Sequence, residues 1–154
     1  MSMQVVRIVE PNPQLEMDIR SMLAAEGLGA PSCDEADLFA LFDADGRIEA
    51  AAFSCFLEDA CFLHAVVVRA ESRRKGLGYA LVSHIVSQSF ARGVRLYLVA
   101  VKARGFFERY GFDEVQREAL PGSIAGQKWF GACAGSDAPV MMIALSEGER
   151  LFGD

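Results

Sequence analysis

The residues with the clearest chemistry lie in the segment VVVRAESRRKGLGYALVSHI, at 66–85. A basic run, 73–75, comes directly before Gly76 and Gly78, and the apolar spacing after it is helical. The first turn of a helix presents unpaired backbone N–H groups and about half a positive charge, so it attracts anions. Glycine lets an anion approach the backbone because it has no Cβ. We therefore predict that this turn binds a pyrophosphate or a similar group, with a solvated run of surface charge as the alternative.

The spacing of the glycines separates this turn from two common phosphate-binding loops. A dinucleotide-binding fingerprint has G-x-G-x-x-G/A almost directly after a strand. Here Leu81 stands in the third glycine position, and roughly seven residues separate Val68 from Gly76. The pattern G-x-x-x-x-G-K-[ST] does not occur. The succession of strand, basic turn, two glycines and helix is therefore the more specific signal.

The composition limits what else the chain binds. Hydrophobic residues make up 52% of the 154 residues and charged residues 23%, which is typical of one globular domain over 1–154. The net charge is −6 and the isoelectric point is near 4.9, so no broad surface for nucleic acid or an anionic membrane is expected. No apolar run reaches the ~20 residues that span a bilayer, and the first residues lack a signal-peptide pattern. We expect a cytoplasmic protein.

The cysteines and histidines do not form a metal-binding pattern. No two cysteines have the short spacing of zinc or redox sites, and His64 and His84 do not complete a ligand set. We therefore expect no metal, and we expect thiols that are reduced and partly buried. The four cysteines are Cys33, Cys55, Cys61 and Cys133.

Hydrophobic periodicity predicts the elements that must position these residues. Helices are expected at 12–29, at about 74–91 and at 103–111, the first with Asn12 as its N-cap and Pro13 in its first turn. The segment 120–138 reads as irregular or briefly helical. This order predicts a single α+β domain. The expected strands are 3–10, a pair within 37–58 joined by a tight turn at 43–46, then 60–68, 94–101, 112–118 and 139–145.

Two segments carry a resemblance to a known family. The segment VVVRAESRRKGLGYAL, at 66–81, resembles the acyl-CoA-binding motif of the GNAT superfamily of N-acyltransferases, Q/R-x-x-G-x-G/A after a strand, with Ala70 where many relatives have proline. ARGFFERYGF, at 103–112, resembles the superfamily's A-x-x-F-Y-x-K-x-G-F segment. The resemblance implies a three-layer fold, with a mixed, mostly antiparallel sheet of about 6–7 strands and helices on both faces. It also implies transfer of acetyl from acetyl-CoA to a primary amine, most simply a small molecule, by direct attack in a ternary complex.

The same resemblance assigns residues to the cofactor. In this superfamily the central strand carries a bulge and splays from its neighbour, so its backbone pairs with the pantetheine arm and a backbone N–H stabilises the oxyanion. The N–H would be that of Val66 or Val67. The resemblance further implies that the protein can form a homodimer. The residues assigned to acetyl-CoA are Val66, Val67, Val68, Arg73, Arg74, Lys75, Gly76, Leu77, Gly78 and Tyr79.

His64 is the first candidate for the catalytic base. It precedes Val66 by two residues, so on a regular strand it shares that residue's face. An imidazole with a pKa near 6.5 suits removal of a proton from an ammonium group, and related arylalkylamine acetyltransferases have a histidine at this place. A structural histidine or a pocket-lining residue is the alternative. Glu58, at a predicted turn, is the second candidate, with a solvated surface carboxylate as its alternative.

The leaving thiolate has no obvious proton donor. In this superfamily a tyrosine often stands second in the F-Y pair, but the pair here is Phe106-Phe107. Phe107 is then expected in the core or against the cofactor, and Tyr110 in a structural role, while Tyr97 stays open as a donor. Two other functions remain alternatives: an acyl-CoA-binding module without turnover, and an unrelated nucleotide-phosphate binder.

The C-terminal third offers weaker signals. Trp129 and Phe130 fall where an acceptor pocket could form, with core packing as the alternative. Several arginines are candidates for contact with the cofactor or an acidic substrate, or else surface charges: Arg104, Arg109 and Arg117. One set of residues resembles a bacterial GNAT subgroup associated with arsenic resistance, although CA stands where that subgroup has CP: Arg117, Leu120, Pro121, Ile124, Phe130, Cys133 and Ser136.

Overall fold

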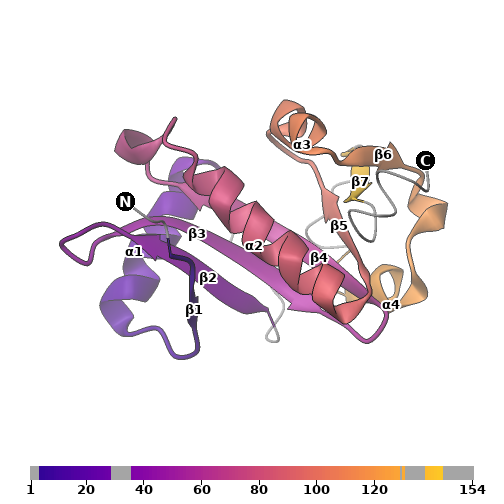
Figure 1. Cartoon of the computed structure of the whole chain (residues 1–154), viewed down its shortest axis with the longest axis horizontal. Coiled ribbons are helices and arrows are strands. Elements are labelled where there is room, and N and C mark those ends of the chain that lie inside the picture. The colour runs from indigo at the N-terminus through magenta and orange to yellow at the C-terminus, as the bar shows by residue number, and fades with distance from the viewer. Residues whose placement is uncertain (1–3, 29–35, 129, 131–137, 144–154) are drawn as a thin grey trace.

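The computed structural model describes residues 4–28, 36–128, 130 and 138–143. These residues form a mixed seven-stranded sheet in the order β1-β2-β3-β4-β5-β7-β6, with helices on both faces (Figure 1). The strands are β1 (Val6–Ile8), β2 (Asp37–Phe42), β3 (Ile48–Phe56), β4 (Ala60–Val68), β5 (Arg95–Val99), β6 (Asp113–Val115) and β7 (Val140–Ile143). The helices are α1 (Pro13–Ala25), α2 (Leu77–Arg92), α3 (Arg104–Tyr110) and α4 (Gly122–Ala125), with short 3-10 turns at Ala70–Ser72 and Arg117–Ala119. The predicted α+β class is confirmed.

The two halves of the sheet meet at a parallel pair. Strands β1 to β4 form antiparallel pairs in sequence order, and β4 then pairs with β5 in parallel. A parallel neighbour needs a crossover connection, and α2 provides it. The last strand, β7, lies between β5 and β6 and pairs with both in the antiparallel sense. The middle of the sheet is therefore the parallel pair of β4 and β5, and α2, which connects these two strands, covers one face of the sheet there.

Each face of the sheet has its own apolar layer. Helix α2 buries Leu81, Val82 and Ile85 against one face, and all three are 0% exposed. Helix α1 buries Ile19 and Leu23 against the other face of β2, β3 and β4. A third cluster, under α4, joins β4, β5 and β7. The two long helices thus hold β4 from opposite sides.

The ends of the two long helices follow local sequence signals. The Asn12 side chain accepts a hydrogen bond from the Leu15 N–H at 2.8 Å, which confirms it as the N-cap of α1. Helix α2 begins at Leu77, three residues later than predicted, because 70–72 form a 3-10 turn and Gly76 has a left-handed φ of 78°. This backbone conformation favours glycine, so Gly76 sets where the chain turns into the helix.

Other expectations have mixed outcomes. The irregular 120–138 segment contains the short α4, and its later part lies largely outside the described residues. The described residues form one sheet with its helices, and a single domain over all of 1–154 stays a prediction. None of the helices in the described part of the chain is long and apolar enough to cross a membrane.

Candidate functional site

A bulge interrupts β4 at its centre. Phe53 of β3 pairs with Ala65, but the next residue, Ser54, pairs with Leu63, so His64 is an extra residue in β4. One extra residue bends a strand and shifts its side chains by one position. The bulge therefore separates β4 into two parts with different register to β3.

Beyond the bulge, β4 leaves its other neighbour. In the described residues β4 pairs with β5 only from Ala60 to Leu63, whereas Ala65 to Val68 pair with β3 alone. The backbone N–H and C=O groups on that edge of β4 have no strand partner, and such an edge can pair with an extended ligand. The two strands thus open like a V in the middle of the sheet.

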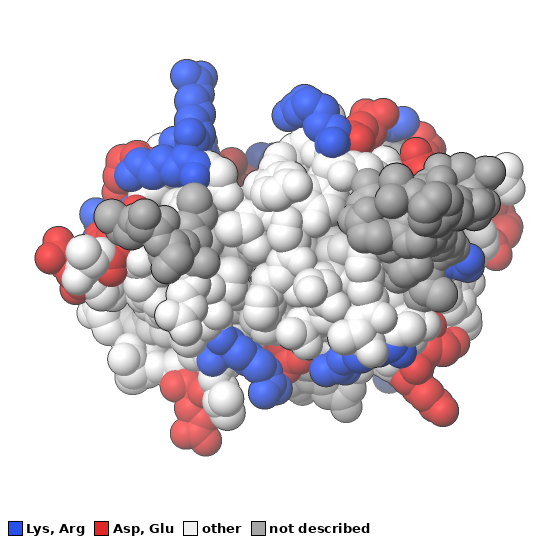
Figure 2. All heavy atoms as spheres, viewed as in Figure 1, with Lys and Arg blue, Asp and Glu red and all other residues white. Residues whose placement is uncertain are grey.

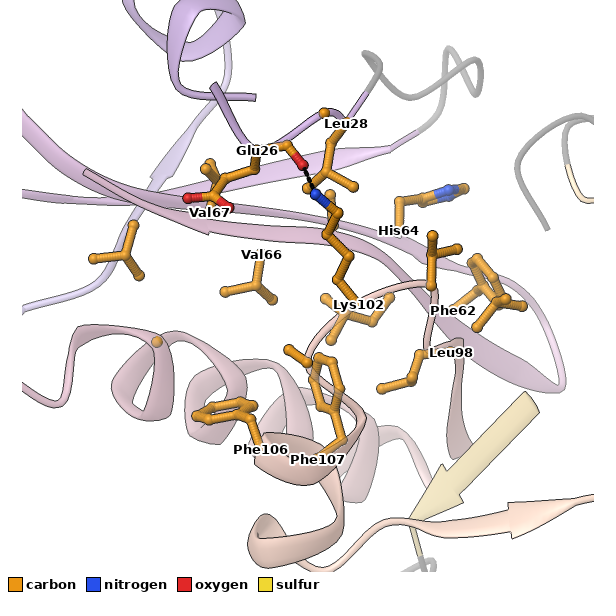
Figure 3. A pocket seen from close by; sticks show the side chains of 18 of the residues that line it. Glu26, Leu28, Phe62, His64, Val66, Val67, Leu98, Lys102, Phe106 and Phe107 are labelled. Atoms are coloured by element: carbon orange, nitrogen blue, oxygen red, sulfur yellow. Dashed lines mark hydrogen bonds between the residues drawn. The ribbon is translucent and has the colours of Figure 1, made fainter. Parts of the chain in front are cut away.

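A cavity of about 680 Å³ occupies this opening. Its wall is mainly apolar and comes from β4, the end of β5, the first turn of α2 and α3 (Figure 3). Gly78 lines it beside Val68, at the C-terminal end of β4, and Phe62 and His64 line it nearer the start of that strand. A volume of this size suits a small-molecule site, which is usually a concave apolar cleft with a few polar groups.

The turn before α2 closes one end of the cavity. A Cβ added at Gly78 would lie 3.7 Å from Val68, 3.8 Å from Phe106 and 3.9 Å from Val66, so this residue is where helix, strand and α3 meet. Arg73 and Gly78 line the cavity, whereas Leu77 is buried in the core. Arg74, Lys75 and Tyr79 are exposed beside the turn. Basic side chains project from the surface near the start of α2 and again over α3 (Figure 2).

A charged cluster at the mouth of the cavity was missed at the sequence level. Arg73 makes an ion pair with the Glu26 carboxylate, and the Lys102 ammonium group donates a hydrogen bond to the Glu26 backbone oxygen (Figure 3). All three residues line the cavity. They are up to 76 residues apart in the chain, so no local pattern indicates that they meet.

Comparison with known proteins connects this geometry to a family. A family model described as an acetyltransferase (GNAT) domain matches residues 34–114, which include β2 to β5, the basic turn, α2 and α3. That range is more than half of the 154 residues. The chain belongs to the GNAT acetyltransferase family. No curated protein matches this sequence.

Solved structures share the GNAT fold along most of the chain. N-acetylglutamate synthase from Neisseria gonorrhoeae, in complex with coenzyme A and N-acetyl-glutamate, matches with a TM-score of 0.74 at 15% identity. The match covers 95% of this chain but 36% of the synthase, so this chain spans about a third of that protein. The ribosomal-protein-S18-alanine N-acetyltransferase from Escherichia coli matches with a TM-score of 0.66 at 20% identity over 94% of this chain and 95% of its own. A GNAT-family acetyltransferase from Staphylococcus aureus Mu50 matches with a TM-score of 0.71 at 14% identity over 94% and 100% of the two chains.

The family match ends before the residues of the predicted subgroup. It stops at residue 114, whereas the resemblance to arsenic-resistance proteins rests on residues from Arg117 onward. Trp129, Cys133 and Ser136 lie outside the described residues, as does Cys33. The arsenic-related subgroup therefore stays a prediction.

His64 lies in the GNAT cleft, but not on the face expected for it. Val66 and Val68 point to the α2 side, where both pack with its core cluster. The His64 ring instead contacts Phe62 at 5.0 Å between centroids, and Phe62 belongs to the cluster under α4. The expectation that His64 shares the face of Val66 is wrong, because it assumed a regular strand, whereas His64 is itself the extra residue of the bulge.

Burial changes the proton affinity of His64. Loss of water around the ring disfavours the charged imidazolium, and this lowers the pKa of His64 from 6.5 to about 4. The ring is therefore neutral at pH 7. Glu58, the second candidate, is exposed in the β3–β4 turn and does not appear among the described residues that line the cavity.

The phenylalanines of the second motif line the cavity, whereas the candidate tyrosines pack elsewhere. Phe106 and Phe107 both line the cavity, and Phe107 also packs in the core, as expected. Tyr110 donates a hydrogen bond to the Ser83 hydroxyl at 3.0 Å, and Tyr97 is buried in the cluster under α4. No tyrosine is found among the described residues of the cavity wall. In that part of the chain, no group of three or more His, Cys, Asp and Glu side chains could hold a metal ion.

The three candidate arginines lie outside the cavity wall as described. Arg104 makes ion pairs with Glu108 at 3.3 Å and Glu114 at 2.6 Å. Arg117 donates a hydrogen bond to the Ala138 backbone oxygen at 2.9 Å and lies over the Phe130 ring. Within the part of the chain that the structure describes, these contacts indicate structural roles for Arg104 and Arg117.

Proposed function

We propose that this protein is an N-acetyltransferase that moves acetyl from acetyl-CoA to the primary amine of a small molecule, by direct attack in a ternary complex. The observation that carries the proposal is the opening between β4 and β5, which leads to the basic turn and the first turn of α2. An extended cofactor arm needs free strand edges, and a pyrophosphate needs free N–H groups at a helix start. The cleft offers both, in the open edge of β4 and in the first turn of α2.

The cofactor would lie along the cleft in one direction. Its pantetheine arm would pair with the open edge of β4 at Val66 to Val68, and its pyrophosphate would meet the backbone and side chains from Arg73 to Tyr79. Coenzyme A in the synthase structure from Neisseria gonorrhoeae supports this choice of ligand over a nucleotide. The thioester would then lie near the bulge, within the part of the cavity that His64 and Phe62 line.

The reaction needs no enzyme nucleophile. The neutral amine attacks the thioester carbon, a C–N bond forms and the carbonyl oxygen becomes an oxyanion. A backbone N–H of Val66 or Val67, on the open edge of β4, would stabilise that oxyanion. As the C–N bond forms the nitrogen loses a proton, and the intermediate then collapses, so that the C–S bond breaks and the thiolate leaves. The protein contributes orientation, an apolar site and a proton acceptor.

His64 is the proposed acceptor for the proton that leaves as the C–N bond forms. An ammonium group with a pKa near 10.4, that of a lysine side chain, would not give its proton to an imidazole whose pKa is about 4. We therefore assign the first proton, which the ammonium loses, to solvent. The nitrogen becomes acidic as it bonds to carbon, and a neutral imidazole can then take its second proton. The alternative, a histidine that only lines the pocket, predicts little effect of His64→Gln on kcat.

The leaving thiolate would be protonated by water. Phe107 stands at the position of the usual tyrosine, and thiols have an ordinary pKa of about 8.5, so a thiolate is a stable leaving group near neutral pH. The missing tyrosine also favours the second candidate function, an acyl-CoA-binding module without turnover. Release of free CoA thiol in the presence of amines distinguishes the two functions.

Calorimetric titration of acetyl-CoA into the wild type and Gly76→Asp tests the proposal. The new side chain would place a carboxylate where the pyrophosphate is expected, so binding should be lost. Gly46→Asp is the matched control, because Gly46 has a similar φ of 83°, has nothing within 4 Å of an added Cβ and lies outside the cleft. No binding of acetyl-CoA to folded wild-type protein would contradict the proposed function. Binding followed by thiol release across a panel of primary amines would support the enzyme, and binding without release would support the module.

A further inference from the structure

Charged side chains meet at one point of an otherwise apolar cleft. Arg73 comes from the turn before α2, Glu26 from the end of α1 and Lys102 from the loop after β5. The Arg73 guanidinium pairs with the Glu26 carboxylate, and the Lys102 ammonium group donates to the Glu26 backbone oxygen. Figure 3 shows Lys102 reaching across the cavity to Glu26. The contacts therefore connect both walls of the cleft near its basic end.

The backbone holds Glu26 at this place. It is the C-cap of α1, and the hydrogen bonds from Gly27 N–H to Ala24 and from Leu28 N–H to Leu23, 3.0 and 2.9 Å long, close the helix end around it. Carbonyl oxygens at a helix C-terminus carry partial negative charge, which explains why the Lys102 ammonium group binds there. The Glu26 carboxylate is thus presented to Arg73 by a fixed backbone.

Arg73 has two competing anions. Its position in the motif places it where the cofactor's pyrophosphate is expected, but in the structure the Glu26 carboxylate binds its guanidinium. The neighbouring Lys75 is less constrained, because its nearest described carboxylate, Glu49, is 3.9 Å away. A guanidinium binds a phosphate group through two parallel hydrogen bonds, and a pyrophosphate carries more charge than one carboxylate. The cofactor can therefore displace Glu26.

We propose that the Glu26–Arg73 ion pair is an internal competitor of the cofactor, so that binding of the pyrophosphate exchanges one partner of Arg73 for the other. The inference rests on the proposed function. Both side chains are partly exposed, 30% for Glu26 and 49% for Arg73, and exposed ion pairs change an equilibrium constant by about 1.4- to 5-fold. Glu26 thus lowers the affinity for acetyl-CoA by a factor in that range and keeps Arg73 at the entrance before the cofactor arrives.

A double-mutant cycle on the dissociation constant of acetyl-CoA tests the exchange. Glu26→Gln should tighten binding about 1.4- to 5-fold, because Arg73 no longer has to leave a carboxylate. Arg73→Ala should weaken binding. In the Arg73→Ala background, Glu26→Gln should have no effect on the dissociation constant, because the guanidinium for which Glu26 competes is absent.

Glu71→Gln controls for the loss of one negative charge near the same turn. Glu71 pairs with Arg47 at 3.2 Å and Arg69 at 3.9 Å rather than with Arg73, so it should leave the dissociation constant unchanged. A neutral or weakening effect of Glu26→Gln, an equal tightening by Glu71→Gln, or a tightening that persists in the Arg73→Ala background would each overturn the inference. Thermal unfolding of every variant shows that it is folded. If the wild type binds no acetyl-CoA, the proposed function itself fails. If it binds acetyl-CoA and the cycle shows no coupling between Glu26 and Arg73, only the inference about this ion pair is wrong.

Discussion

The Glu26 carboxylate and the Arg73 guanidinium form an ion pair across the mouth of the GNAT cleft. One residue ends α1 and the other lies in the turn that precedes α2, so the pair joins the helices that cover opposite faces of the sheet. Lys102, from the loop after β5, donates a hydrogen bond to the backbone oxygen of the same glutamate. A ligand that lies along β4 must pass these three side chains, and their contacts bear on both stability and binding.

Lys102→Met should destabilise the protein slightly. The substitution keeps much of the side-chain length but removes the positive charge from the C-terminus of α1, a contact that contributes less than about 1 kcal/mol at an exposed site. Urea unfolding measures the free energy of unfolding. Lys128→Met is the control, because Lys128 is also an exposed lysine and is not among the described residues that line the cavity. Equal losses in the two variants would mean that the contact with Glu26 contributes nothing.

His64 should make the protein less stable as the pH falls below neutrality. Its pKa is about 4 in the folded state and near 6.5 when unfolded. Between these values the unfolded chain binds the extra proton, so the free energy of unfolding rises with pH in this window. From pH 7.5 to pH 5 the wild type should lose about 2 kcal/mol more than His64→Gln. Urea unfolding of the wild type and His64→Gln at both pH values measures this difference, and an equal loss in the two proteins would contradict it.

Tyr79 should contribute to binding of the adenosine end of acetyl-CoA. Its side chain lies one residue beyond Gly78, is 59% exposed and contacts the Tyr110 ring at 5.0 Å between centroids. Stacking of a base on an exposed aromatic ring contributes about 1–3 kcal/mol. Tyr79→Ala should therefore weaken binding of acetyl-CoA about 5- to 150-fold but leave acetyl-pantetheine, which lacks the adenosine, unaffected. Tyr79→Phe should retain the affinity, and equal losses for both ligands in Tyr79→Ala would show that Tyr79 acts elsewhere.

Cys61 should be unreactive in the folded protein. It is 0% exposed in β4, and burial raises the pKa of its thiol to about 12, although Arg92 nearby lowers it in part. Because the thiolate is the reactive form, alkylation by iodoacetamide should occur at Cys61 only after unfolding. Peptide mass spectrometry before and after addition of urea measures this. Rapid modification of Cys61 in native protein would show that the centre of the sheet opens in solution.

Much of the fold follows from local patterns. The β4 segment 60–68 has the predicted limits, and α1 starts at the predicted cap. The limits of β4 depend on hydrophobic spacing and the start of α1 depends on one capping side chain. Residues that are close in the sequence are enough to specify both features. The position of β7 between β5 and β6 is different, because it depends on which free strand edge the last strand meets, and periodicity does not contain that information.

The sequence by itself determined the element order, the basic turn with its two glycines and the family that this combination resembles, because these features are contiguous in the chain. Only the tertiary structure decided how the side chains of the cleft are arranged. The bulge in β4 depends on pairing with β3, and it turns His64 away from Val66 and toward Phe62. The meeting of Glu26, Arg73 and Lys102 depends on how two helices and a loop pack around the sheet. Contacts between distant segments form only when the whole core is buried, and no short pattern specifies them.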